Sequence, residues 1–407
     1  MSKLKNYLFI FVLIFVILYP KFPLLGVGGT FVAIRLEDVL IAITFLAFGI
    51  LNIKKLADLN KPIQKSIILY WLVGFVSVFS AIFVTKSADL NLGLLHAFRR
   101  IEYMGMFMVG YWAINSKKDF QFLVKTILLI SLIVGIYGLG QQFFDWPVIS
   151  TNNSEFSKGL ALKLGPEARV NSTFGGHYDL AAFSLIPLLW IVAIGGLPAL
   201  LMSIIPYWAM LLSASRVTFV AFFAAAGLYL ILTKKKVWIF FLILVSIVSF
   251  FASPQLLGRY RQLIVDQFKL TYYPSLALAE ADALKPSAVS EDRSLNIRLN
   301  VSWPKAVKAL AKNPILGTGF SSIGLASDND YLRMLAETGI LGTIAFCMVI
   351  YKILVLWFGS KDKIVLASGC ALLALLLNAA FIDIFEASKV AIVFWGIAGA
   401  VSKYAQS

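Results

Sequence analysis

Long apolar stretches alternate with short polar segments along almost the whole chain. Most of these stretches are long enough for a helix to cross about 30 Å of hydrocarbon, so the pattern predicts an all-α polytopic membrane protein of about twelve transmembrane helices. The expected spans are 5–25, 36–53, 65–85, 97–114, 120–144, 177–195, 198–213, 216–233, 237–252, 330–357, 363–382 and 389–404. The span at 198–213 has the weakest pattern.

Two polar segments are much longer than the other connections. One covers residues 146–176, and the other covers residues 253–329, between the ninth and tenth expected spans. Loops of this size usually carry function or are disordered. Helical apolar spacing inside the second segment predicts a large helical loop outside the membrane. We therefore expect a single integral membrane domain, residues 1–407, with two outward loops.

Composition supports this interpretation and limits the kinds of partner that the protein can bind. The chain of 407 residues is 60% hydrophobic and 14% charged, with a mean hydropathy of +0.85, which is too apolar for a soluble globule. Its net charge of +15 would suit nucleic acid, but no groove-reading module is visible. Membrane lipid and phosphate are the expected partners. Cys347 and Cys370 lie in apolar runs, where they resemble small hydrophobic residues and not metal ligands.

Lysines and arginines are distributed differently along the chain. Lysine-rich connections alternate with lysine-poor ones, which places both termini in the cytoplasm. All ten arginines then fall on the opposite side or at the outer ends of helices, the reverse of the usual bias. They are Arg35, Arg99, Arg100, Arg169, Arg216, Arg259, Arg261, Arg293, Arg298 and Arg333. Because guanidinium groups bind phosphate through two hydrogen bonds, we expect an outward site for an anionic, lipid-linked substrate.

The sharpest local pattern is DNDYLRMLAETGILG, residues 328–342, at the outer mouth of the tenth expected span. Here Asn329 is followed by nine residues and then by Gly339 and Gly342. The chain resembles the O-antigen ligase and O-antigen polymerase superfamily of bacterial envelope glycan enzymes, in whose ligases a histidine precedes this pattern. Asp328 stands at the histidine position in this chain, a departure that favours a polymerase.

Two further strings carry the same resemblance, which is specific for residues 169–342. The first is SASR, which ends in Arg216, and the second runs from Arg298 to Gly319 through Trp303, Pro314 and Gly317. The resemblance implies a GT-C-like glycosyltransferase in the bacterial inner membrane with its active site on the extracytoplasmic face. It also implies inverting, metal-independent glycosyl transfer from undecaprenyl diphosphate-linked oligosaccharide, without a cofactor. A chain-length regulator is an expected further partner.

Candidate site residues follow from the chemistry of that reaction. Arg216 and Arg298 are expected to stabilise the charge of the leaving diphosphate. Asp328 is a candidate base for the acceptor hydroxyl, and His177 is its rival. Residues expected to help bind the substrate are Arg169, Arg293, Asn329, Arg333 and Glu337.

Simpler interpretations compete with these roles. Asp328 or Asp330 would serve as an ordinary helix cap, and Arg333 with Glu337 as a helix-face ion pair. Arg216 would reach lipid headgroups from its helix start, while Arg298 would be solvated. His177 and His96 would be interface residues without chemistry.

The function also has alternatives. A ligase would transfer the finished glycan to a lipid A core or another acceptor. A flippase or exporter of lipid-linked oligosaccharide would carry basic residues through the depth of the membrane. Peptidoglycan-polymerising glycosyltransferases also place a long outward loop among about ten helices, and they remain a further alternative.

Overall fold

The computed structural model describes residues 2–21, 23–26, 33–148, 169–253, 298–324 and 327–407, and these residues are mostly helical. The long helices are α1 (Ser2–Leu18), α2 (Leu36–Leu51), α3 (Pro62–Phe83), α4 (Leu90–Ala113), α5 (Lys117–Phe143), α6 (His177–Ile194), α7 (Leu197–Leu212), α8 (Arg216–Leu232), α9 (Lys236–Ala252), α14 (Asp330–Phe358), α15 (Lys363–Ala379) and α16 (Ser388–Ala405). The shorter elements are β1 (Pro23–Gly26), β2 (Ala33–Arg35), η1 (Ile53–Asn60), η2 (Arg298–Ser302) and α13 (Trp303–Lys312).

Four of the described helices are long and apolar enough to cross a membrane by themselves: α3, α5, α6 and α14. A fifth is added if α2 and η1 count as one bent span, and α7, α8, α9 and α15 are shorter apolar helices. Helices lie at or near the ranges expected for spans. The count of about twelve spans stays a prediction, as does the helical nature of the whole 253–329 loop, because 254–297 lies outside the described residues.

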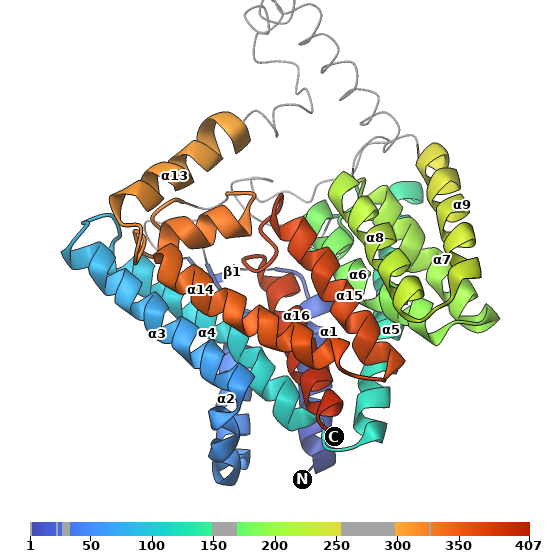
Figure 1. The fold of residues 1–407 in the computed structure, drawn as a ribbon, viewed down its shortest axis with the longest axis horizontal. Coiled ribbons are helices and arrows are strands. Elements are labelled where there is room, and N and C mark those ends of the chain that lie inside the picture. Colours follow the sequence, from blue (N-terminus) through green and yellow to red (C-terminus); the bar gives the residue numbers. More distant parts are fainter. Residues whose placement is uncertain (1, 22, 27–32, 149–168, 254–297, 325–326) are drawn as a thin grey trace, which may run out of the picture.

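The helices pack around one apolar core. The closest packing joins α4 and α16, where a Cβ atom at Gly110 would lie 2.0 Å from the carbonyl oxygen of Gly396 and one at Gly399 would lie 1.9 Å from that of Phe107. Glycine at these positions lets the two backbones touch, as small residues do between membrane helices. In Figure 1, α1 begins and α16 ends at one end of the bundle, while α13 lies at the other.

A buried lysine ties three segments together at the end of the bundle where α1 ends. Lys389 is fully buried near the start of α16, and its Nζ donates hydrogen bonds to the carbonyls of Ile17, Tyr19 and Thr173 at 3.2, 2.7 and 2.6 Å. The first two carbonyls belong to the C-terminal end of α1, where a cation is favourable. Beside them, β1 and β2 pair as a small antiparallel hairpin that the sequence pattern did not predict.

Helix α14 is interrupted at Gly339. The φ and ψ angles of Gly339 are 66° and −167°, a backbone conformation that is open essentially only to glycine. The segment 313–319 packs into this break, and a Cβ atom at Gly339 would lie 2.3 Å from the carbonyl oxygen of Ile315. The sequence pattern did not predict that the segment with Pro314, Gly317 and Gly319 would insert into the following helix.

The inserted segment replaces the hydrogen bonds that α14 loses at the break. Ile340 N donates to Pro314 O at 2.9 Å, and Thr318 N donates to Ala336 O at 2.8 Å. The Glu337 carbonyl accepts from Gly319 N at 2.9 Å and also from the Ser77 hydroxyl of α3 at 2.6 Å. The polar backbone of the break is therefore satisfied inside the bundle, as it must be within a membrane.

Candidate functional site

The structure pairs two of the predicted catalytic residues. The Nε atom of Arg298, in η2, donates a hydrogen bond to Oδ2 of Asp328 at 3.0 Å. Arg298 is only 9% exposed, whereas the Asp328 side chain is 37% exposed. The expectation of a solvated Arg298 is therefore wrong: burial against a carboxylate holds the guanidinium in one place.

Two further predicted residues, Arg169 and His177, form a pair beside Arg298 and Asp328. An Arg169 guanidinium nitrogen lies 2.8 Å from Nε2 of His177, the first residue of α6. Arginine can only donate, so Nε2 accepts and the imidazole proton sits on Nδ1. The next residue, Tyr178, connects the two pairs, because its ring lies 4.0 Å from the His177 ring and 6.0 Å from the Arg298 guanidinium carbon. His177 is thus part of a polar group and not a mere interface residue.

The cap of α14 is Asn329. Its side-chain oxygen accepts from Leu332 N at 3.0 Å. The prediction that Asp328 or Asp330 caps this helix is wrong, because Asp330 instead accepts from Ile384 N and Phe385 N at 2.6 and 3.0 Å. The carboxylate of Asp328 is left to face Arg298, and its backbone takes a positive φ of 52°, which aspartate tolerates better than most residues.

Burial changes the acidity of Asp328. Partial desolvation raises the pKa of its carboxyl above the ordinary aspartate value. The positive charge of Arg298 lowers the pKa again, and the negative charge of Asp383 raises it, with a net result above normal. Burial therefore has the largest effect on the pKa of Asp328. A carboxylate with a raised pKa is a better proton acceptor than an ordinary one.

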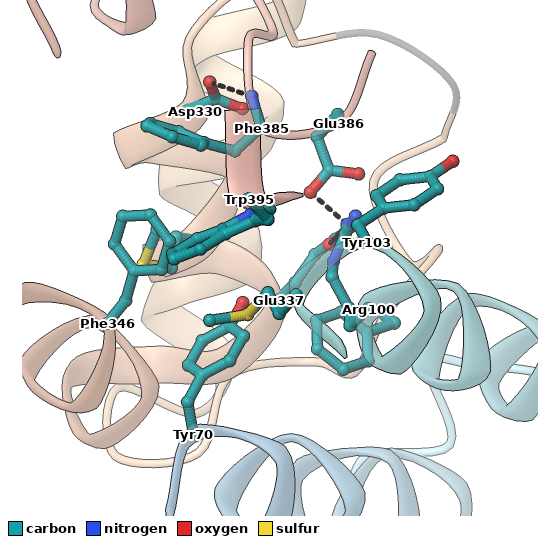
Figure 2. Close-up of a pocket in the computed structure, with 12 residues that line it drawn as sticks. Tyr70, Arg100, Tyr103, Asp330, Glu337, Phe346, Phe385, Glu386 and Trp395 are labelled. Carbon is teal, nitrogen blue, oxygen red and sulfur yellow. Dashed lines mark hydrogen bonds and ion pairs between the residues drawn. The ribbon is translucent and has the colours of Figure 1, made fainter. Parts of the chain in front are cut away.

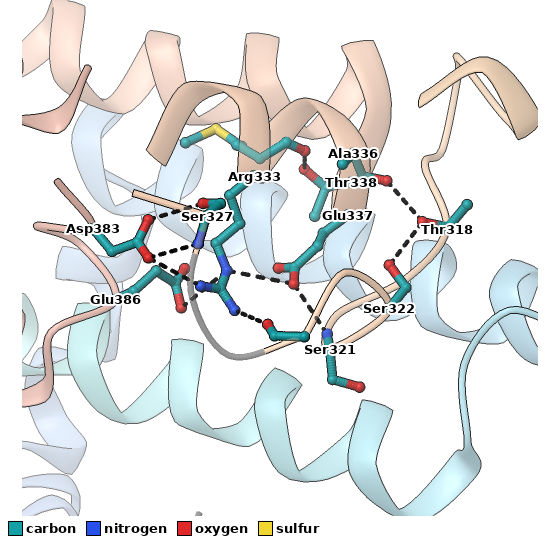
Figure 3. Close-up of polar contacts among 12 residues, drawn as sticks. Thr318, Ser321, Ser322, Ser327, Arg333, Ala336, Glu337, Thr338, Asp383 and Glu386 are labelled. Atoms are coloured by element: carbon teal, nitrogen blue, oxygen red, sulfur yellow. Dashed lines mark hydrogen bonds and ion pairs between the residues drawn. The ribbon is translucent and has the colours of Figure 1, made fainter. Parts of the chain in front are cut away.

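Arg333 and Glu337 lie one helical turn apart on α14 in a buried ionic cluster, shown in Figure 3. The Arg333 Nε lies 3.4 Å from Oε1 of Glu337, and both side chains are almost fully buried. Arg333 also contacts Asp383 at 3.4 Å and Glu386 at 3.8 Å, from the segment between α15 and α16. The guanidinium of Arg333 therefore binds protein carboxylates, which fits a structural role better than the predicted contact with substrate.

Arg100 of α4 joins the same cluster. Its guanidinium forms an ion pair with Glu386 and a longer one, at 3.6 Å, with Glu337. Figure 2 shows it beside a small cavity lined by aromatic rings, among them Tyr70 and Trp395. The cavity measures about 20 Å³, enough for about one water molecule and far too small for a sugar.

The contacts given above do not join two of the predicted arginines, Arg216 and Arg293, to these site residues. Arg216 begins α8, half-buried, directly after Ser215. The start of that helix is fixed by Thr218, whose hydroxyl hydrogen-bonds Asn378 at the end of α15 at 2.6 Å. The segment that carries Asp383 follows α15 immediately. The start of α8, where Arg216 lies, is therefore next to the same end of α15 as that segment. Arg293 lies outside the described residues.

Three charged residues of the site were missed by the sequence analysis: Arg100, Asp383 and Glu386. Arg100 was named only among the ten outward arginines and was given no role of its own. The available signal for the two carboxylates was an acidic pair in IDIFEAS, between two apolar spans. Carboxylates this close to the membrane are usually paired or functional. Among the described residues, no group of three or more His, Cys, Asp or Glu side chains is placed to hold a metal ion.

The fold and the site define a multi-pass helical membrane protein with a group of arginines and carboxylates at the end of the bundle that carries α13. Residues 197–347 match the family model described as O-antigen ligase, and this confirms the resemblance to the O-antigen ligase superfamily. The match indicates glycan transfer of the ligase or polymerase type. It includes Arg216, Arg298 and Asp328, whereas Arg169 and His177 precede it. No curated protein matches the chain.

Proposed function

We propose that the protein polymerises polysaccharide repeat units, such as those of O-antigen or exopolysaccharide, by moving a growing glycan from undecaprenyl diphosphate onto a lipid-linked repeat unit. The observation that carries the proposal is the Arg298–Asp328 pair, which brings a buried phosphate-binding group and a carboxylate of raised pKa together. Both residues lie in the segment that matches the O-antigen ligase model. The site faces the extracytoplasmic side of the bacterial inner membrane, and both termini are cytoplasmic.

The reaction proceeds as one displacement with inversion. Asp328 accepts the proton of the acceptor hydroxyl, and the resulting oxygen bonds to the anomeric carbon from the face opposite the diphosphate. The bond from that carbon to the diphosphate oxygen breaks, and undecaprenyl diphosphate leaves with the electron pair. Arg298 and Arg216 stabilise its charge, with Arg169 and Arg293 as further ligands, so that the reaction needs no metal ion. Asn329 and Glu337 support the site from inside the protein, because Asn329 caps α14 and Glu337 belongs to the buried ionic cluster.

Ligation is the second candidate, because the matching family model is described as O-antigen ligase and the chain keeps Asn329 at the required distance from Gly339. In that case the protein hands the finished glycan to a lipid A core or another acceptor. The aspartate at position 328, where ligases carry histidine, favours the polymerase.

The two candidates give different products. Purified protein is incubated with undecaprenyl diphosphate-linked repeat units, with and without an added terminal acceptor and with a chelator in a parallel set, and the products are resolved by length. A ladder supports the polymerase, and a single transfer that needs the acceptor supports the ligase. No covalent product overturns both and leaves an exporter. The anomeric configuration of the new linkage, compared with that of the donor, tests inversion.

A further inference from the structure

Asp383 lies, partly buried, between the turn that carries Asp328 and the ionic cluster of α14. It lies in the segment between α15 and α16, and Figure 3 shows it facing both Ser327 and Arg333. Its Oδ2 accepts from Ser327 N at 3.0 Å and Asp328 N at 3.3 Å, and its Oδ1 accepts from Asn329 N at 3.2 Å. The Ser327 hydroxyl donates to Oδ1 at 2.9 Å.

Three successive backbone N–H groups thus converge on one carboxylate. Such a concave turn binds anions well, and here the anion is a side chain of the protein itself. The arrangement explains how Asp328 keeps a positive φ of 52°, since the hydrogen bonds on either side of it hold the turn in this shape. A turn fixed in this way sets the direction of the Asp328 side chain toward Arg298.

Asp383 is fixed in turn from its other side. The Nη1 atom of Arg333 lies 3.4 Å from Oδ2 of Asp383, and Arg333 is held by Glu337 and Glu386. The chain of contacts runs from the inner cluster to Asp383 and then to the turn. Of the groups described around Asp328, Arg298 in η2 and Asp383 in the α15–α16 segment are the charges that act on it.

We propose that Asp383 is a positioning residue for glycosyl transfer: it holds the 327–329 turn so that the Asp328 carboxylate meets the acceptor hydroxyl. The negative charge of Asp383 also raises the pKa of the Asp328 carboxyl. This inference rests on the proposed function. Asp383 touches no reacting atom in this scheme and acts only through Asp328. Its loss should therefore affect the rate of the chemical step more than the binding of the lipid-linked substrate.

The test compares Asp383→Asn with wild-type protein in the product-length assay, measured over a range of pH. The amide loses the charge that raises the pKa of Asp328 and turns an N–H group toward the donors of the turn. We expect kcat to fall by about 100-fold, the scale of a misplaced catalytic group, with little change in KM. The acid limb of kcat/KM should move to lower pH, because Asp328 then loses its proton more easily.

Asp330→Asn is the matched control. Asp330 also ties the start of α14 to the α15–α16 segment, through Ile384 N and Phe385 N, so its substitution disturbs the same junction. A general loosening of this junction would act similarly in both variants, so only Asp383→Asn should shift the acid limb. Melting midpoints and elution volumes in detergent show that each variant is folded.

Several results overturn the inference. In an active wild-type background, they are an unchanged kcat in Asp383→Asn, a lower kcat with an unshifted acid limb, or an equal shift in Asp330→Asn. In each case the proposed function stands. If Asp383→Asn does not fold, Asp383→Glu replaces it: the charge is kept, so the acid limb should stay while kcat falls, and an unchanged kcat overturns the inference. A wild-type protein that forms no covalent product overturns both proposals.

Discussion

The Nε atom of Arg298 lies 3.0 Å from Oδ2 of Asp328, and this contact joins η2, ahead of α13, to the turn that begins α14. The two side chains have opposite tasks in the proposed reaction, since one binds the leaving group and the other receives a proton. Their contact shows that the two side chains belong to one site. It also couples them, because the charge of each changes the behaviour of the other.

Replacing Arg298 should slow the chemical step severely. Arg298→Ala removes a buried donor to the leaving diphosphate, and loss of such a donor typically costs about 100- to 1,000-fold in kcat. Arg298→Lys keeps the charge but loses the planar fork, so we expect it to recover only part of the rate. The product-length assay measures both, with Lys308→Ala, an exposed position on α13, as control. Wild-type kcat in Arg298→Lys would remove Arg298 from the catalytic group.

The pH dependence should respond to the same residue in a defined direction. Burial and Asp383 raise the pKa of Asp328, and Arg298 lowers it, so wild-type protein should lose activity on acidification at a pH above the usual aspartate range. Arg298→Gln removes the lowering effect, and the acid limb of kcat/KM should move to higher pH. This is opposite to the shift expected for Asp383→Asn. Profiles that shift in the same direction in both variants would contradict the assignment of Asp328 as the base.

His177 can be separated from Asp328 as the candidate base. Its Nε2 already accepts from Arg169 at 2.8 Å, so we expect His177 to orient that arginine and not to take the acceptor proton. His177→Gln can still offer an oxygen to Arg169, whereas His177→Ala cannot. We therefore expect a smaller loss of kcat in the glutamine variant and an acid limb in both. Disappearance of the acid limb in His177→Gln would identify the histidine as the base.

The sequence predicted the helix positions well because hydropathy alone determines where apolar segments can lie. It also singled out Glu337, since a carboxylate inside an apolar span is unusual. Arg298 and Asp328 followed from the resemblance to the O-antigen ligases and from the chemistry of that reaction. The contact between Arg169 and His177 could be predicted in part, because both residues lie in one short polar segment.

Pairings between distant segments could not be predicted in the same way. Arg100 meets Glu386 only because α4 and α16 pack through Gly110 and Gly399, and a single sequence does not reveal which helix faces are neighbours. The break of α14 was also missed, since Gly339 lies inside an expected span and hydropathy does not report a positive φ. To predict the role of Asp383, one would need to know both which segments are neighbours and which residues have a positive φ.

The break in α14 should be sensitive to a single methyl group. Gly339→Ala places a Cβ atom 2.3 Å from Ile315 O and 2.6 Å from Gly317 N, in addition to a backbone strain of about 1–3 kcal/mol. Gly324→Ala is the matched control, because φ is +89° there as well, but the new Cβ atom would meet only Lys305 Nζ at 3.5 Å. Thermal unfolding in detergent should show a much larger loss of stability for Gly339→Ala. Equal losses would mean that the inserted segment moves aside easily.

The ionic cluster should be more sensitive to losing one charge than to losing two. Arg100→Met leaves the buried carboxylates of Glu386 and Glu337 short of a partner, and breaking a buried pair from one side typically costs about 3–5 kcal/mol. The double variant Arg100→Met with Glu386→Met removes both charges of the closest pair, so it should be more stable than the single variant. Melting midpoints of the two single variants and the double variant complete the cycle. If the two losses simply add, Arg100 and Glu386 do not stabilise each other, and the cluster holds α4 to the α15–α16 segment by packing instead.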